Sequence, residues 1–571
     1  MNPAQTAQNS AHDGRSRPWL KVYDELGLVA PSFDDRTFAQ HIEEHARVRP
    51  GSVALRCFDR DITYREYYEL ACRMANALVS LGVLKGDVVA FMMPNLPQAP
   101  VTIAAISMLG AIGTGVSQLL APVEVAFQLS NSNARVLVIA RPLLEALRRI
   151  ERLPQGLRAI IVTGPADHYD PKHFAASDIA GVRVLRYLDL IASVAPHFEQ
   201  QQIDPHDIFM VQYTGGTTGM PKGAQLSVRT LMHNVIMANA PDGAWDVGNE
   251  VVVCAFPMFH IAGLSWLLLA ARLGATYIVV PDPREVTLLV EQMRRFSPTR
   301  LGAVPALFEM LLRCEGFEKI DFSRLVSAKT GAAPMSPETA RALEAVIGTG
   351  KISEVFGMTE TGPCYTCHPP ARYKRGSVGF PAPGADVRIR DAKTGAADVP
   401  AGEPGEICCS GPQLMRGYLN LPDETAHALR EIDGRLWMFS GDIGYMDEEG
   451  YLFLCDRAKD MLIVGGFKVF SLEIEHKLAA LACVERCAIV GEPDLARPGN
   501  DIVTLFVQVR DRRPDRGAED IQHEILEFCR DSMAPYKVPK QIHIVDAIPL
   551  TGIGKIDKKA LRERLRQAEG R

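Results

Sequence analysis

A stretch rich in glycine and threonine, YTGGTTGMPKG at residues 213–223, has the composition of an anion-binding loop. Its glycines let successive backbone N–H groups converge on an anion, its hydroxyls add short hydrogen bonds, and the ammonium of Lys222 adds positive charge. It differs from the phosphate loop of nucleotide kinases, in which Ser or Thr follows the Lys directly, because Gly223 follows Lys222 here. Taken alone, the stretch fits a structural turn as well as a phosphate site.

Four further stretches carry residues suited to nucleotide chemistry. They are PMFHIAG at 257–263, EVFGMTETGP at 354–363, SGDIGYMDEEGYL at 440–452 with DRAKDMLIVGGFKV at 456–469, and PLTGIGKIDKKAL at 549–561. In this order and at these distances, the five stretches resemble the acyl-adenylating superfamily, which includes acyl-CoA synthetases, adenylation domains of peptide synthetases and beetle luciferase. The resemblance covers nearly the whole chain from about Thr37, and the YTGGTTG form is most similar to that of fatty acyl-CoA ligases.

The resemblance implies a binding site for ATP in the large part of the chain. The β- and γ-phosphates are expected to lie against Thr214, Gly215, Gly216, Thr217, Thr218, Gly219 and Lys222. The nucleotide is further expected to be lined by Gly331, Ala332, Ala333, Pro334, Glu354, Val355, Phe356, Gly357 and Met358. Phe356 then stacks on adenine at a position where relatives more often carry Tyr.

Polar residues of the same stretches are expected to act on the phosphates and the ribose. By the resemblance, Thr359 contacts the α-phosphate and Glu360 holds Mg²⁺, a hard cation that prefers carboxylate oxygens. Asp442 accepts hydrogen bonds from the ribose hydroxyls, and Arg457 adds a cation beside it. Without the neighbouring motif, an Asp in SGD is more typical of a turn.

The last part of the chain is expected to move about a hinge at Lys459. By the resemblance, Lys555 bridges the substrate carboxylate and the α-phosphate during adenylation, although a lysine within KIDKK is otherwise typical of a solvated surface. The implied reaction joins the acid to AMP with release of pyrophosphate, and coenzyme A then attacks the anhydride, so that one hard step becomes two easier ones. The segment with Gly465, Gly466 and Phe467 is implied to admit the pantetheine arm of coenzyme A.

The acyl group is expected to be hydrophobic and is most simply a fatty acid. Amino-acid-activating relatives carry an Asp in their counterpart of PMFHIAG, whereas this chain has His260 beside Phe259. His260 is either a gate to the acyl tunnel, as the resemblance implies, or a core histidine, and nearby apolar residues suit a hydrocarbon as well as plain packing. Those residues are Ile261, Leu264, Trp266 and Leu267.

Two alternative functions follow from the same motifs. A stand-alone adenylating enzyme would load a carrier protein's phosphopantetheine instead of free coenzyme A, and the sequence hardly separates the two. A non-catalytic nucleotide-binding homologue would be expected to lack Lys222, Glu360, Asp442 or Lys555, all of which are present.

The CYTCH run at 364–368 has the spacing of a c-type haem attachment site. Haem would require export, and zinc would require ligands beyond one CxxC and one His.

The elements that position these residues are predicted to form an α/β fold with stacked sheets. Helical patterns such as 63–81, where Thr63 and Glu66 have capping-box spacing, alternate with short apolar runs. Those runs start at Val88, Arg135, Ala159, Asp207, Glu250 and Ala275. After Gly376 the chain becomes rich in Gly, Pro and Asp, which indicates a β-meander or small barrel, and the residues after 460 indicate a small α+β unit.

These patterns predict a division into an N-terminal lead-in (1–36), a large ATP- and acyl-binding domain (37–455, β-rich from about 376), a hinge (456–460) and a small mobile C-terminal domain (461–571).

The net charge of −6 is spread along the chain without a basic block, which argues against nucleic acid as a partner. The apolar segment from Ile261 is interrupted at Arg272 and Gly274, so we expect a buried helix and a strand in place of a membrane span. A polar N-terminus and twelve cysteines without paired spacing favour a cytoplasmic protein with reduced thiols. The acid's chain length and a homodimeric state stay open.

Overall fold

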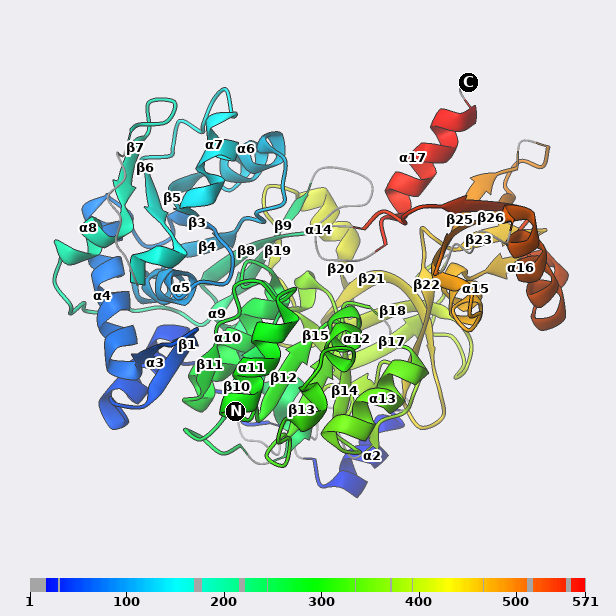
Figure 1. Cartoon of the computed structure of the whole chain (residues 1–571), viewed down its shortest axis with the longest axis horizontal. Coiled ribbons are helices and arrows are strands. Elements are labelled where there is room, and N and C mark those ends of the chain that lie inside the picture. Colours follow the sequence, from blue (N-terminus) through cyan, green and yellow to red (C-terminus); the bar gives the residue numbers. More distant parts are fainter. Residues whose placement is uncertain are drawn as a thin grey trace.

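Two large sheets with helices packed on them form the main body of the computed structural model (Figure 1). The structure describes residues 17–28, 31–168, 177–214, 221–243, 245–333, 335–369, 372–392, 394–465, 467–494, 496–510, 517–550 and 556–569. The expected α/β fold, with a large N-terminal part and a small C-terminal part, is confirmed. None of the helices in these ranges has the length and apolar character needed to cross a membrane.

The first sheet has eight strands in the order β19-β9-β8-β4-β3-β5-β6-β7 and is parallel from β8 to β7. Its strands are β3 (Val88–Met92), β4 (Ile112–Gly115), β5 (Ala134–Ala140), β6 (Ala159–Thr163), β7 (Arg183–Arg186), β8 (Ile208–Thr214), β9 (Lys222–Ser227) and β19 (Gly417–Tyr418). The helices between them are α4 (Tyr64–Ser80), α5 (Gln98–Leu109), α6 (Pro122–Asn131), α7 (Leu144–Arg148), α8 (Tyr187–Ala192) and α9 (Val228–Asn239). The helix predicted at 63–81 is confirmed with its capping box, in which Thr63 and Glu66 bond each other's backbone N–H groups.

The second sheet has nine strands in the order β16-β15-β14-β13-β12-β10-β11-β1-β2. They are β1 (Val53–Cys57), β2 (Arg60–Thr63), β10 (Val251–Cys254), β11 (Thr276–Ile278), β12 (Arg300–Ala303), β13 (Ser327–Thr330), β14 (Ile352–Gly357), β15 (Cys364–Cys367) and β16 (Phe380–Pro381). Its helices are α3 (Phe38–Val48), α10 (Ile261–Leu273), α11 (Val286–Phe296), α12 (Pro305–Leu312) and α13 (Pro337–Ile347). The apolar segment from Ile261 is therefore a buried helix followed by a strand, as predicted, and Gly274 ends the helix in the left-handed conformation.

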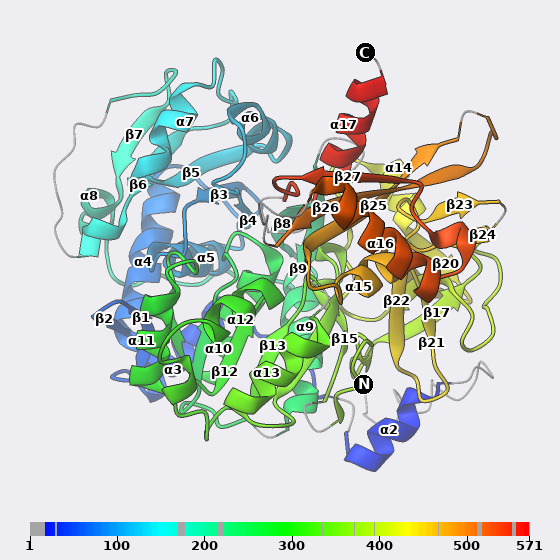
Figure 2. The same cartoon turned by 45° about the vertical axis from the view of Figure 1, so that its right-hand side comes forward.

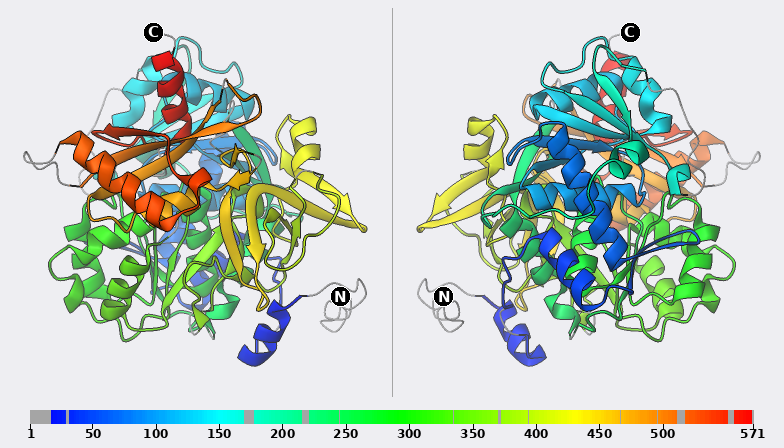
Figure 3. Two further views of the ribbon diagram at one scale, coloured as in Figure 1. Left: turned by 90° about the vertical axis from the view of Figure 1, so that its right-hand side faces the viewer. Right: turned by 90° about the vertical axis from the view of Figure 1, so that its left-hand side faces the viewer.

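The region after Gly376 supplies a five-stranded antiparallel sheet, and its β20–β21 end projects from the body (Figure 3). Its elements are β17 (Asp386–Arg390), β18 (Gly405–Ser410), α14 (Pro422–Ala428), β20 (Leu429–Ile432), β21 (Arg435–Met446) and β22 (Leu452–Arg457). The C-terminal residues form a small α+β unit with its own apolar core, drawn in orange and red beside β22 (Figure 2). It contains β23 (Leu462–Val464), β24 (Phe467–Val469), α15 (Ser471–Leu478), β25 (Val484–Pro493), β26 (Asp501–Val509), α16 (Ala518–Ser532), β27 (Gln541–Val545) and α17 (Lys558–Glu569).

Part of the expected N-terminal lead-in is structured. Helix α2 (Trp19–Leu26) buries Trp19, Val22 and Tyr23 against Phe380 and Tyr451. The sequence WLKVYDEL has apolar residues at i, i+3 and i+4, which is the spacing of a one-sided helix. An eight-residue helix of this kind is stable only because its apolar face is packed.

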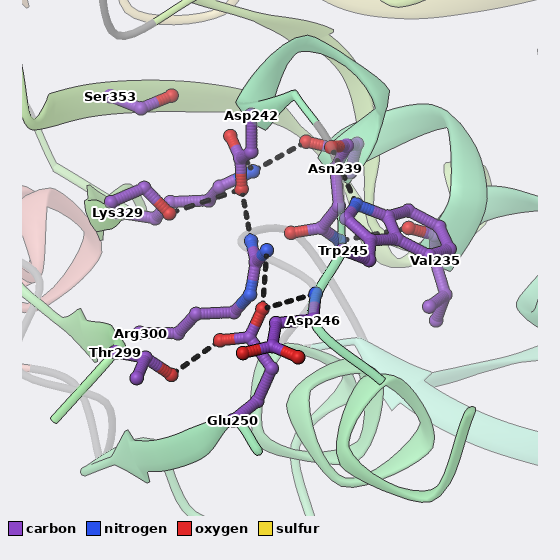
Figure 4. A network of polar contacts seen from close by, with 12 residues as sticks. Val235, Asn239, Asp242, Trp245, Asp246, Glu250, Thr299, Arg300, Lys329 and Ser353 are labelled. Carbon is purple, nitrogen blue, oxygen red and sulfur yellow. Dashed lines mark hydrogen bonds and ion pairs between the residues drawn. The ribbon is translucent and has the colours of Figure 1, made fainter. Parts of the chain in front are cut away.

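A buried network of charges ties strands β12 and β13 of the second sheet, and the residue before β10, to the turn that follows α9 (Figure 4). Arg300 of β12 lies 2.6 Å from Asp242 and 3.1 Å from Glu250, and Lys329 of β13 lies 3.0 Å from Asp242. The four side chains are at most 6% exposed and carry two positive and two negative charges. Removing one member would leave an uncompensated buried charge, which costs more than the pair contributes.

Candidate functional site

The ends of the glycine-rich loop are joined by strand pairing. Thr214 ends β8, Lys222 begins β9, and the two residues are register partners in the antiparallel pair. The Lys222 ammonium forms an ion pair with Glu424 of α14 and lies 5.2 Å from the ring centroid of Tyr418. The hydrogen bond from Lys222 lowers the pKa of the Glu424 carboxyl. The predicted phosphate-binding lysine is therefore engaged with a carboxylate in this structure.

Glu360 is a buried carboxylate held by Tyr418. The Tyr418 hydroxyl donates a hydrogen bond of 2.6 Å to Oε1 of Glu360, which is 4% exposed. Burial raises the pKa of the Glu360 carboxyl, while Tyr418 and the nearby Arg457 act in the opposite direction. Among the described residues Glu360 forms no ion pair, and such a buried carboxylate fits Mg²⁺, because this ion is usually held by one or two carboxylates together with substrate phosphates.

The short turn that carries Thr359 and Glu360 is held by hydrogen bonds from helix α9. Thr359–Thr361 forms one 3₁₀ turn, and the side-chain amide of Asn234 donates hydrogen bonds to the carbonyl oxygens of Thr361 and Cys364. Asn234 is 1% exposed, so these bonds have no competition from bulk water. The turn that bears the proposed phosphate and cation ligands is thereby attached to a core helix.

Asp442 and Arg457 face each other on neighbouring strands. They are register partners in β21 and β22, and Nε of Arg457 lies 3.0 Å from Oδ1 of Asp442. Asp442 is 5% exposed and lies within a strand, so the interpretation of SGD as a simple turn is wrong. Asp442 and Arg457 both influence the ionisation of Glu360, which places the three side chains in one electrostatic neighbourhood.

The segments expected to contact the base lie at the ends of β13 and β14. A Cβ atom at Gly331 would come within 2.9 Å of the Val355 carbonyl oxygen, so glycine permits this close approach. The next residue, Ala332, has a φ of 69°, a strained conformation of the kind that persists at functional sites. Phe356 on β14 is half-buried and meets Tyr365 edge to face.

The remaining residues of this segment differ in their surroundings. Burial raises the pKa of Glu354 to about 7, and the Tyr373 hydroxyl bonds its carboxyl. Val355 and Gly357 lie in β14, Met358 follows its last residue, and Ala333 lies in the bend after β13.

His260 is the N-cap of α10. Its Nδ1 accepts a hydrogen bond of 3.2 Å from the backbone N–H of Ala262, so the ring caps the helix, and the expected role as a gate stays a prediction. The chain before it is anchored by Asn95, which donates to the Phe256 carbonyl and accepts from the Met258 N–H. The apolar residues that follow, Ile261, Leu264, Trp266 and Leu267, are all packed in the main core.

The C-terminal candidates lie on the small unit and at its border. Lys459 is exposed directly after β22. Gly465 has a φ of 59°, and its N–H donates to Asn500. Phe467 is 57% exposed and stacks on Tyr536 with ring centroids 4.6 Å apart. Phe467 therefore stacks on Tyr536 with one face and exposes the rest of its ring beside the Gly465 turn.

Several predicted site residues lie outside the described residues. These are Gly215, Gly216, Thr217, Thr218 and Gly219 of the phosphate loop, Pro334, Gly466 and Lys555.

The structure also brings in residues that sequence reasoning missed. Tyr418, Asn234 and Glu424 contact Glu360, its turn and Lys222, yet each lies between 58 and 202 positions from its partner. The CYTCH run is strand β15 with its following histidine, where Cys364, Cys367 and His368 are buried. Burial lowers the pKa of His368 to about 4, and Nε2 of its ring lies 2.8 Å from the Ser377 hydroxyl. In the part of the chain that the structure describes, no three His, Cys, Asp or Glu side chains gather as a metal site.

Comparison with known proteins matches both parts of the chain. The AMP-binding enzyme family matches residues 42–419, and the AMP-binding enzyme C-terminal domain matches residues 473–555. The chain is 34% identical to a long-chain-fatty-acid–CoA ligase of Yersinia pestis, covering 95% of this chain and 97% of that protein. It is 32% identical to a long-chain-fatty-acid–CoA ligase of Escherichia coli O6:H1, with 93% and 94% covered.

Solved structures extend the comparison to ligand complexes. The anthranilate CoA ligase AuaEII in complex with anthranoyl-AMP has a TM-score of 0.82 and 25% identity, covering 95% of this chain and 99% of that chain. ATP-bound MatB from Rhodopseudomonas palustris has a TM-score of 0.78 and 26% identity, with 92% and 98% covered. The first of these structures holds an acyl-adenylate and the second holds ATP.

Proposed function

Because the chain belongs to the AMP-binding enzyme family and is an AMP-forming acid–thiol ligase that uses ATP and coenzyme A, we propose that its acid substrate is a hydrophobic, fatty carboxylic acid. The observation that carries this proposal is the segment 257–267, PMFHIAGLSWL, which has no acidic residue to pair with a substrate ammonium. The relatives named for long-chain fatty acids agree with it, whereas the structural relative AuaEII is named for anthranilate.

We propose that the described polar residues divide the work around one nucleotide. Lys222 leaves Glu424 and pairs with the triphosphate, whose charge attracts an ammonium more strongly than a single exposed carboxylate does. Asp442 is oriented by Arg457 and accepts from the ribose hydroxyls, while Thr359 donates to the α-phosphate. Phe356 offers an aromatic face to adenine.

Glu360 is the proposed ligand of Mg²⁺. When bound, the ion would neutralise charge on the phosphates. The contribution of the protein is to hold the Glu360 carboxylate in one orientation, through the Tyr418 hydroxyl on one side and the Asn234-bound turn on the other.

We propose that residues 461–571 turn relative to residues 37–455 about Lys459 between the two half-reactions. Lys555 supports attack of the carboxylate oxygen on the α-phosphorus, with pyrophosphate as the leaving group. The thiolate sulfur of coenzyme A then attacks the acyl carbon, and AMP leaves with the electron pair of the broken C–O bond. We propose that the ring of Phe467, which is exposed beside Gly465, contacts the pantetheine arm.

A panel of acids tests the proposed substrate. Purified enzyme is supplied with ATP, Mg²⁺, coenzyme A and one acid from butanoate to octadecanoate, or with benzoate, anthranilate or malonate. In an apolar pocket each added methylene contributes about 0.8 kcal/mol, so kcat/KM should rise by up to about 4-fold per methylene until the pocket is filled. A preference for benzoate, anthranilate or malonate over every fatty acid would contradict the proposal. Thioester formation only with a carrier protein would favour the alternative acceptor.

A further inference from the structure

A buried group of charges lies beside the proposed hinge, outside the nucleotide site. We call Asp456, Ser471, Glu475 and Lys558 the hinge cluster. The Lys558 ammonium lies 2.8 Å from Oε1 of Glu475 and 2.5 Å from the Ser471 hydroxyl, and the carboxylate of Asp456 accepts a hydrogen bond from the Ser471 backbone N–H. Asp456 is 3% exposed and Ser471 is fully buried. Such a group is stable only if its charges stay together.

The members of the hinge cluster come from both sides of Lys459. Asp456 belongs to β22, which is paired with β21 in the five-stranded sheet. Ser471 and Glu475 lie on α15, and Lys558 begins α17, so these three belong to the C-terminal unit. A turn about Lys459 would therefore carry Ser471, Glu475 and Lys558 away from Asp456.

Asp456 supplies what α15 lacks at its first turn. The N-cap residue of α15, Phe470, makes no side-chain capping bond, and Asp456 provides a carboxylate oxygen to the first helical N–H instead. A negative charge at a helix N-terminus is favourable because the N–H groups there carry partial positive charge. Separation would leave this N–H without its acceptor.

The cation of the cluster is placed close to the adenylating lysine in sequence. Lys558 lies three residues after Lys555, and the chain on either side of 551–555 is fixed by a bridge between Leu550 and Ile556. The Asp557 N–H also donates to the Pro549 carbonyl. The anchoring of Lys558 therefore sets where the chain continues after the Lys555 segment.

Two other ion pairs, which lie on the C-terminal side of Lys459, show by contrast which contact spans the hinge. Arg562 of α17 pairs with Asp460, which follows Lys459 and so turns with the C-terminal unit. Glu473 of α15 pairs with Lys537 at 2.6 Å, again within that unit. Both pairs would survive the turn, whereas the contacts of Asp456 would not.

We propose that Asp456 is a positioning residue that fastens the C-terminal unit in the observed orientation through Ser471 and Lys558, and so sets the balance between the two half-reactions. This inference rests on the proposed two-step reaction with a hinge at Lys459. The proposed role of Asp456 acts through Ser471 and Lys558 and requires no contact with a substrate.

The test compares the two half-reactions in Asp456→Asn and Asp456→Ala. Adenylation is measured as acid-dependent exchange of pyrophosphate into ATP, and thioester formation is measured from presynthesised acyl-AMP and coenzyme A. We expect the ratio of the two rates to change by about 10-fold, because weakening one orientation shifts the population between the two. The control Glu473→Gln breaks an ion pair within the C-terminal unit and should leave the ratio unchanged. Equal loss of both rates in the Asp456 variants would overturn the proposal.

A double-variant cycle and an orientation measurement cover the case of a poorly folded variant. If Asp456 acts through Lys558, Asp456→Asn combined with Lys558→Met should change the ratio no more than the stronger single change does. Fluorophores at the exposed positions 79 and 519 report the distance between the two parts by energy transfer. The distance distribution should change in Asp456→Asn and not in Glu473→Gln, and an unchanged distribution in Asp456→Asn would refute the positioning role of Asp456. If the unaltered enzyme shows no acid-dependent exchange of pyrophosphate into ATP, the proposed function is refuted. The energy-transfer measurement would still show whether Asp456 holds the C-terminal unit in place.

Discussion

Replacing Tyr418 by Phe is expected to impair adenylation specifically. The change removes the hydroxyl that donates a hydrogen bond of 2.6 Å to Oε1 of Glu360, and it keeps the aromatic ring near the Lys222 ammonium. A hydrogen bond to a charged acceptor contributes about 1.5–3 kcal/mol, so kcat/KM for ATP in pyrophosphate exchange should fall by about 10- to 150-fold. Thioester formation from presynthesised acyl-AMP should change little, because no pyrophosphate is present in that step.

The same variant should show a characteristic pH dependence. Burial raises the pKa of Glu360, and the Tyr418 hydrogen bond counteracts this by favouring the ionised form. Without the hydroxyl the carboxyl takes up a proton at higher pH, so the deficit in exchange should be larger at the acidic end of the profile than at the alkaline end.

A matched control separates this effect from general loss of stability. Tyr64→Phe removes another buried hydroxyl, which donates a hydrogen bond of 2.9 Å to the Ala275 carbonyl oxygen and not to a residue of the proposed site. Its exchange activity should stay near that of the unaltered enzyme. Exchange by Tyr418→Phe within about 3-fold of the unaltered enzyme, far below the loss of a charged hydrogen bond, would refute the role of Tyr418.

Two further predictions concern Glu424 and His368. Glu424→Gln should lower the KM for ATP by about 2- to 5-fold, because the partly exposed ion pair with Lys222 contributes at most about 1 kcal/mol. The control Asp423→Asn on the same helix should leave the KM unchanged. An unchanged or higher KM in Glu424→Gln would contradict the proposed competition between Glu424 and ATP for Lys222. For His368, burial lowers the pKa to about 4, so the unfolded chain binds a proton between about pH 6.5 and 4 that the folded chain does not, and stability is lost as pH falls through this window. The loss attributable to His368 is about 3 kcal/mol. In His368→Gln, Tm should therefore decrease less as the pH is lowered, whereas the control His523→Gln at an exposed site should behave like the unaltered protein. If Tm falls equally with pH in His368→Gln and in the unaltered protein, protonation of His368 is not the cause of the acid instability.

The elements that could be predicted from the sequence are those determined by local patterns. The helix after Thr63 was predictable because its capping box and its apolar spacing lie within one segment. The buried strands from Val88 to Ile278 were predictable because short apolar runs alternate with helical patterns. Helix α2 was missed because its eight residues become stable only against Phe380 and Tyr451, which are more than 350 positions away.

The site residues that could be predicted are those that lie within a short sequence motif. Glu360, Asp442 and Arg457 were identified from their motifs, and the structure places them in one neighbourhood. Tyr418 and Asn234 were not predictable, because their contacts arise from the pairing of β19 with β9 and from the packing of α9 under the Thr359 turn. The capping role of His260 depends on where α10 begins, which the sequence places only to within a few residues.

The two half-reactions of Lys555→Ala test the proposed two-step chemistry most directly. With a saturating fatty acid, exchange of pyrophosphate into ATP should fall by at least about 100-fold, because a preorganised cation at the transferring phosphorus is lost. The same preparation should convert presynthesised acyl-AMP and coenzyme A into thioester at nearly the rate of the unaltered enzyme. A similar loss in both reactions, or full exchange without the ammonium, would contradict the assignment of this lysine to adenylation alone.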